Sequence, residues 1–202
     1  MNYVLDLDDT LYPEISWRMS AFKFLADYFN IPELYFFLIK NQNKPTCFID
    51  MIDRYTIKTS VTDLIRLMKT HDPTISLPKE SKIFLEKHKK DNLFLVTNGC
   101  AKMQVAKIKA LDIAHYFKSI QVCDWYGKSY WKPAPFVYNV LVDHFDLKKE
   151  DTIVIGDNPK SDFLIPQLYG WKCYRLLQGN FKDLHLNYPY DCKNKVTSIL
   201  SI

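Results

Sequence analysis

The sequence has no long hydrophobic run and no basic, apolar leader at its start. The longest uninterrupted apolar stretch runs from Leu34 to Ile39, whereas a membrane-spanning helix needs about 20 consecutive apolar residues. The first residues lead directly into a short strand that ends in acidic side chains, which is not the pattern of a secretory signal. We therefore expect a soluble, cytoplasmic protein that does not enter a membrane.

Paired cysteines are also absent. The five cysteines are scattered along the 202 residues, with no C-x-x-C pair and no histidines at a matching spacing. An odd number of isolated cysteines predicts neither a disulfide framework nor a zinc site. We expect these thiols to be reduced and mostly buried.

No charge of one sign dominates the chain, whose formal net charge is +4. Residues 1–72 carry 8 basic and 10 acidic side chains, and residues 73–202 carry 19 and 13. The mild excess of positive charge in the second part would attract anionic substrates. The lysines between residues 79 and 90 have the spacing of a solvated helix face, and the pI is only 8.6, so nucleic acid is not an expected partner. Nothing in the sequence indicates an oligomeric state.

What the chain does contain is enough apolar material for one substantial core and a modest second lobe, with 48% hydrophobic residues. Residues 13–72 have apolar side chains at helical spacing and no strand pattern, which predicts a small lobe of four helices. From residue 73 onward short apolar strands alternate with helices. This alternation predicts an α/β fold with three layers, a mainly parallel sheet covered by helices on both faces.

Two aspartates end the first predicted strand. The apolar run Tyr3 to Leu5 is followed by Asp6-Leu7-Asp8, so the side chains of Asp6 and Asp8 leave the backbone on the same side. Two carboxylates this close do not both stay ionised without a cation, and the pair predicts a metal ion or a held proton. A second interpretation is that these residues only end the strand and cap the next helix.

Polar groups suited to phosphate follow the next two predicted strands. Thr97, Asn98 and Gly99 offer a hydroxyl and then backbone N–H groups at the start of a helix, which is a typical phosphate cradle. Lys132 follows the third strand, directly before Pro133. In a parallel sheet the ligand lies at the carboxyl ends of the strands, so these groups are expected to meet the two aspartates.

The fourth predicted strand adds two more carboxylates to the same edge, Asp157 and Asp162. Four acidic side chains in one place would repel one another strongly unless a divalent cation lies among them. Oxygen ligands suit Mg²⁺, which often keeps waters or a phosphate oxygen among its ligands.

The polar groups that follow the four predicted strands, taken in chain order, form four motifs. These motifs resemble those of the haloacid dehalogenase superfamily, whose hydrolases form an aspartyl-phosphate. The resemblance covers nearly the whole chain and implies a catalytic core of residues 1–12 and 73–202 with an inserted helical cap of the first type at residues 13–72. The opening Asp-Leu-Asp-Asp-Thr-Leu-Tyr-Pro is similar to that of pyrimidine-nucleotidase-like members, and phosphoglycolate-phosphatase-like members are also similar. The motifs are Asp6 to Leu11, Thr97, Lys132-Pro133, and Gly156-Asp157 with Asp162.

The resemblance implies a Mg²⁺-dependent phosphomonoesterase acting on a small soluble phosphate ester, such as a nucleoside monophosphate or a sugar phosphate. Asp6 would be the nucleophile and Asp8 the general acid and base. The implied phosphate-binding groups are Thr97, the amide of Asn98 and Lys132, and the implied metal ligands are Asp6, the backbone carbonyl of Asp8, Asp157 and, directly or through water, Asp162.

Two alternatives remain open at this stage: a phosphomutase with the same core residues, and a catalytically silent member that acts as a binding protein. Trp17 and Phe22 in the predicted cap are suited either to stacking on a nucleobase or to core packing.

Pro166 is expected to shorten or kink the helix after Asp162, and the segment from Gln178 onward carries no recognisable pattern.

Overall fold

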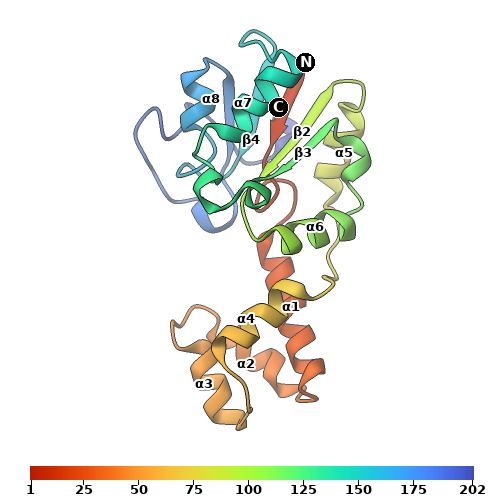
Figure 1. The fold of residues 1–202 in the computed structure, drawn as a ribbon, viewed down its shortest axis with the longest axis vertical. Coiled ribbons are helices and arrows are strands. Elements are labelled where there is room, and N and C mark those ends of the chain that lie inside the picture. The colour runs from red at the N-terminus through yellow and green to blue at the C-terminus, as the bar shows by residue number, and fades with distance from the viewer.

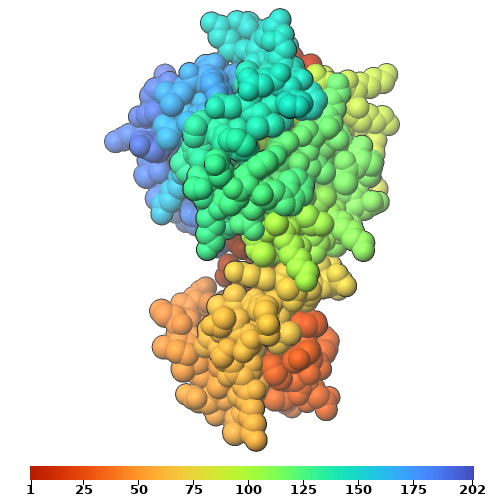
Figure 2. Space-filling view, viewed as in Figure 1, coloured from red at the N-terminus to blue at the C-terminus, as the bar shows by residue number.

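The computed structural model describes all 202 residues and has two parts, a sheet covered by helices and a helical lobe joined to it by a narrow neck (Figures 1 and 2). The sheet has six strands, and every neighbouring pair is parallel. The predicted α/β fold is therefore confirmed. In spatial order the strands are β3 (Ser119–Val122), β2 (Asn92–Thr97), β1 (Asn2–Leu5), β4 (Thr152–Gly156), β5 (Lys172–Leu176) and β6 (Asn194–Val196).

Alternating side chains of the central strands pack into two separate cores, one on each face of the sheet. Tyr3 and Leu5 of β1 belong to one buried cluster, and Val4 between them belongs to the other. This alternation is what a strand buried on both faces requires, and it explains why these strands are continuously apolar. The first face is covered by α5 (Lys79–Lys87) and α6 (Ala101–Ala110), and the second by α7 (Phe136–Phe145) and α8 (Leu164–Leu168) (Figure 1).

The second part of the molecule consists of four helices, as the helical spacing of residues 13–72 predicts. Ser60 begins the last of them, because its hydroxyl accepts a hydrogen bond from the amide of Asp63 at 3.0 Å. The side chains of Trp17 and Phe22 are buried, at 8% and 3% exposure, inside the apolar cluster that the lobe shares with the first face of the sheet. The helices are α1 (Glu14–Tyr28), α2 (Glu33–Asn41), α3 (Cys47–Tyr55) and α4 (Val61–Thr70).

The segment after Gln178 contributes more structure than the sequence indicates. It adds the edge strand β6 and is held to the sheet by Arg175 of β5, whose side chain is completely buried. The guanidinium donates to the carboxylate of Asp191 at 2.7 Å and to the carbonyl of Phe181. A buried cation needs such partners, so the segment completes the core.

The helix after Asp162 is short, as Pro166 leads one to expect, because α8 spans only five residues. No helix of the protein combines the length and the apolar character that crossing a membrane requires.

Candidate active site

The candidate site lies at the carboxyl ends of the central strands, in a cavity of about 110 Å³. β1 runs between β2 and β4, so the residues that follow these three strands share one edge of the sheet. The amide of Asp6 still donates to the carbonyl of Ile155 at 3.0 Å, which extends the ladder to the residue at the cavity. The lining includes six of the residues expected from the sequence: Asp6, Asp8, Asn98, Lys132, Asp157 and Asp162.

Three carboxylates form a tight group at this edge. One oxygen from each of Asp6, Asp157 and Asp162 lies within 4.8 Å of the others. Burial raises the pKa of Asp6 to about 7 and, with the charges of Asp162 and Asp6 adding to it, raises that of Asp157 to about 10. The Oδ2 atom of Asp157 is buried without any hydrogen-bond partner. An orphaned carboxylate oxygen among other carboxylates fits a hard divalent cation, so the residues present suit Mg²⁺.

Asp162 reaches this group because residue 156 is glycine. A Cβ atom at Gly156 would lie 2.4 Å from Oδ2 of Asp162, so any other residue would displace the carboxylate. The amide of Asn158 and the hydroxyl of Ser161 donate to Asp162 at 2.9 and 2.8 Å. Its position is thus determined by the turn after β4 rather than by the short helix that follows.

Lys132 lies at the centre of the site and is almost completely buried. Its ammonium donates to Asp6 at 2.6 Å, to Asp162 at 2.8 Å and to the carbonyl of Val96 at 2.9 Å. Burial disfavours the charged ammonium, but the carboxylates of Asp162 and Asp6 outweigh burial and raise the pKa of Lys132. The lysine therefore supplies a permanent positive charge beside Asp6.

The last residue of β2, Thr97, and the residue after it, Asn98, have different surroundings. The Asn98 side chain accepts from the Lys132 amide at 2.8 Å and donates to the Lys132 carbonyl at 2.9 Å, which holds the lysine segment against the cavity. Thr97 is 1% exposed and does not line the cavity. Its hydroxyl accepts a hydrogen bond of 2.6 Å from Gln104. A phosphate-binding role for Thr97 stays a prediction.

Asp8 is held by residues that the sequence analysis missed. Its carboxylate accepts hydrogen bonds from Lys107 at 2.7 and 2.9 Å, from Gln104 at 2.8 Å and from Tyr12 at 2.6 Å. Lys107 and Gln104 are both fully buried on α6. Burial, with the charge and hydrogen bond of Asp8, raises the pKa of Tyr12, so its hydroxyl stays a donor. The available signal was a lysine and a glutamine three residues apart on the helix that follows the phosphate-cradle motif.

Asp9 connects the active-site loop to two distant segments. Its carboxylate accepts from the amide of Glu14 at 2.8 Å and from the amide of Asn180 at 3.1 Å, while Gln178 donates to its carbonyl at 2.7 Å. A Cβ atom at Gly179 would lie 2.1 Å from the Asp9 carboxylate, so this close approach requires glycine. Burial and then the charge of Asp8 raise the pKa of Glu14, which also lines the cavity.

With four carboxylates and a buried lysine at the ends of parallel strands, the site can be compared with known families. Residues 3–174 match the family model described as haloacid dehalogenase-like hydrolase. The chain belongs to this family. The predicted resemblance is therefore confirmed at the level of the superfamily, and an acidic cluster suited to a divalent cation is consistent with the family.

Relatives of this haloacid dehalogenase-like chain include two phosphatases. A glyceraldehyde 3-phosphate phosphatase of Pyrococcus furiosus is 28% identical over 94 residues, which are 46% of this chain and 38% of the relative. A phosphoserine phosphatase of Thermus thermophilus is 28% identical over 93 residues, which are 45% of this chain and 36% of the relative. The matched segments thus span less than two fifths of either relative.

Among solved structures, the haloacid dehalogenase-like hydrolase YfnB of Bacillus subtilis, bound to magnesium, matches 99% of this chain and 95% of its own. The TM-score is 0.71 at 18% sequence identity. At that identity the likeness shows a shared fold, including the helical lobe as well as the sheet.

Proposed function

We propose that this protein is a Mg²⁺-dependent phosphomonoesterase that acts on a small phosphate ester through an aspartyl-phosphate. The observation that carries the proposal is the position of Asp6, which lines a small cavity beside one buried lysine and within reach of two further carboxylates. Membership in a hydrolase family and two relatives named as phosphatases support it.

Asp6, Asp157 and Asp162 would hold the metal ion, together with the backbone carbonyl of Asp8 that the family resemblance implies. When bound, Mg²⁺ would neutralise part of the carboxylate charge and polarise a phosphoryl oxygen. Lys132 contributes a second positive charge from the protein itself, 2.6 Å from Asp6.

In the first step an oxygen of Asp6 attacks phosphorus. The new bond between Asp6 and phosphorus forms as the bond to the leaving alcohol oxygen breaks, and Asp8 gives a proton to that oxygen. In the second step Asp8 takes a proton from water, the water oxygen attacks phosphorus, and the Asp6 carboxylate leaves with inorganic phosphate as the product. Splitting one hydrolysis into two steps in this way is the general advantage of covalent catalysis.

The remaining residues position these groups. Lys107 and Gln104 hold the Asp8 carboxylate from the α6 side, and Asn98 holds the Lys132 backbone. The amide of Asn98 and the ammonium of Lys132 would face the transferring phosphoryl oxygens, whose charge must be stabilised in the transition state. We further propose that residues 13–72 act as a cap that excludes water when the ester is bound.

The test is phosphate release from an activated aryl phosphate and from a panel of phosphate esters, with Mg²⁺ and with chelator. We expect Mg²⁺-dependent release by the wild-type protein and none by Asp6→Asn, with Asp112→Asn as a matched control because that carboxylate is 96% exposed. Turnover at the wild-type rate by a pure Asp6→Asn preparation would contradict a mechanism with Asp6 as the nucleophile. A sugar phosphate converted to its isomer without phosphate release would favour a mutase instead.

A further inference from the structure

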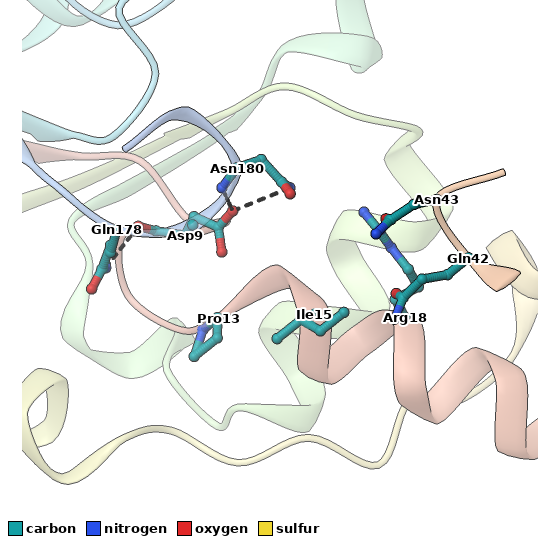
Figure 3. Close-up of a pocket in the computed structure, with 9 residues that line it drawn as sticks. Asp9, Pro13, Ile15, Arg18, Gln42, Asn43, Gln178 and Asn180 are labelled. Atoms are coloured by element: carbon teal, nitrogen blue, oxygen red, sulfur yellow. Dashed lines mark hydrogen bonds between the residues drawn. The ribbon is translucent and has the colours of Figure 1, made fainter. Parts of the chain in front are cut away.

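A second cavity, of about 440 Å³, opens directly beside the catalytic one, between the start of α1, the end of α2 and the segment after β5 (Figure 3). In Figure 3 one group of polar side chains, from α1 and the end of α2, faces another, from the active-site loop and the segment after β5, with Pro13 and Ile15 between them. The polar side chains that line this cavity include Arg18, Gln42, Asn43, Gln178 and Asn180.

The two cavities are neighbours, because Asp9 lines both. Asn180 in the second cavity donates at 2.8 Å to the carboxylate of Glu14, which lines the first. An ester whose phosphoryl group lay at Asp6 would therefore extend its alcohol portion toward the second cavity. The side chains there would contact the leaving group.

Three carboxamide side chains in this cavity donate hydrogen bonds within the protein through their nitrogen atoms, and no protein group donates a hydrogen bond to their oxygen atoms. The nitrogen of Gln42 donates to the carbonyl of Ile39 at 3.1 Å, that of Gln178 to the carbonyl of Asp9 at 2.7 Å, and that of Asn180 to Glu14. The Oε1 atom of Gln42 is buried and has no hydrogen-bond partner. A buried acceptor without a partner is costly unless a ligand supplies a donor, and ligand hydroxyl groups are the donors that suit carboxamide oxygens.

The same cavity also contains a guanidinium group that donates no hydrogen bond within the protein. Arg18 has one charged partner, Glu14, at 3.6 Å, and its guanidinium donates no hydrogen bond within the protein. Its N–H groups are thus available to oxygen atoms of a ligand. The lining offers acceptors and donors together, which matches a molecule with several hydroxyl groups.

No aromatic side chain lines the cavity, and Ile15 is its single hydrophobic residue. Stacking on an aromatic ring is the usual means by which proteins hold a base. Trp17 and Phe22, the aromatic residues considered for this purpose from the sequence, are buried in the apolar core. We propose that this cavity binds the leaving group of the ester and selects a polyhydroxylated, non-aromatic one, such as a sugar phosphate, over a nucleoside monophosphate. This inference rests on the proposed phosphomonoesterase function.

The closing experiment compares ribose 5-phosphate with uridine 5′-monophosphate, which share the sugar and the phosphate and differ in the base. We expect kcat/KM to be higher for ribose 5-phosphate by about tenfold or more, the discrimination that one or two hydrogen bonds supply. An equal or higher value for the nucleotide would overturn the inference. An activated aryl phosphate distinguishes failure of this inference from failure of the proposed function, because no phosphate release even from that ester means that the protein is not a phosphomonoesterase.

The variant Arg18→Gln tests the cavity directly. We expect it to lower kcat/KM for ribose 5-phosphate about tenfold, mainly through KM, and to reduce the preference over the nucleotide. Arg66→Gln is the matched control, since Arg66 on α4 is 74% exposed and lies outside the cavity, and it should leave both values unchanged. Thermal unfolding of both variants verifies folding. An unchanged substrate ratio in folded Arg18→Gln would refute the role of this cavity.

Discussion

Replacing Asp157 by asparagine should stabilise the protein when no divalent cation is present. The pKa of this buried carboxyl rises from 3.8 to about 10 in the folded state. In the unfolded state the carboxyl ionises near its ordinary pKa, so the native state binds more protons at every pH between these values. Stability therefore falls as pH rises through this window, by up to about 1.4 kcal/mol per pH unit.

At pH 7 the accumulated cost is about 4 kcal/mol, because pH 7 lies roughly three units above the ordinary pKa of an aspartate. Asparagine has nearly the same shape and is neutral at every pH, so Asp157→Asn removes this cost. For a chain of 202 residues the gain corresponds to an increase in Tm of roughly 10 °C at pH 7 and less than half of that at pH 5. The Tm of the variant should also depend less steeply on pH.

The assay is thermal unfolding in chelator and in Mg²⁺ at pH 5, 6 and 7, with Asp112→Asn as the control for an exposed carboxylate. Wild-type protein should gain stability from Mg²⁺, by about 2.7 kcal/mol at a hundredfold excess over the dissociation constant, and the variant should gain little. A variant that is no more stable than wild type in chelator would contradict the raised pKa of Asp157, and a variant that responds to Mg²⁺ as wild type does would refute the assignment of Asp157 to the metal site.

Two further substitutions test the supports of the site. Lys107→Met leaves the Asp8 carboxylate without its buried cation, so it should lower kcat sharply and lower the free energy of unfolding by about 3 kcal/mol. Lys107→Arg should restore part of kcat. Equal kcat in wild type and Lys107→Met would contradict the positioning role of Lys107. Arg175→Met removes the fully buried partner of Asp191 and leaves that carboxylate with Lys195 alone, at 2.9 Å. Chemical denaturation should show a loss of stability smaller than the roughly 3–5 kcal/mol that a wholly unpaired buried charge costs, while an unchanged midpoint would show that the segment after β5 is held by other contacts.

The sequence was most informative where the fold follows from a local pattern. The short apolar strands and the helices between them predicted a parallel sheet, and a parallel sheet brings the residues after its strands to one edge. Asp6, Asp157 and Lys132 meet for that reason. The strand order is enough to predict that these residues lie together, and the right-handed connections between parallel strands restrict that order.

The supports of the site could not be predicted in this way. Lys107 and Gln104 belong to a helix whose other buried positions are apolar, and only the three-dimensional packing turns these two side chains toward Asp8. The contact between Asn180 and Asp9 joins segments 171 residues apart without any periodic pattern. The hydrogen bond that the Thr97 hydroxyl accepts from Gln104, a buried amide on α6, could not be predicted either, and the role of this hydroxyl at a phosphate stays a prediction.

The measurement that tests the central claim most directly is the capture of the phosphoryl group on the protein. Asp8→Asn should still be phosphorylated by an activated aryl phosphate, whose leaving group needs no proton, but it should lack the base for the second step, so labelled phosphoryl accumulates. After an acid quench and peptide mapping, the account predicts the label on Asp6. Label on another residue, or steady turnover of wild-type protein with no protein-bound phosphoryl in either form, would contradict it.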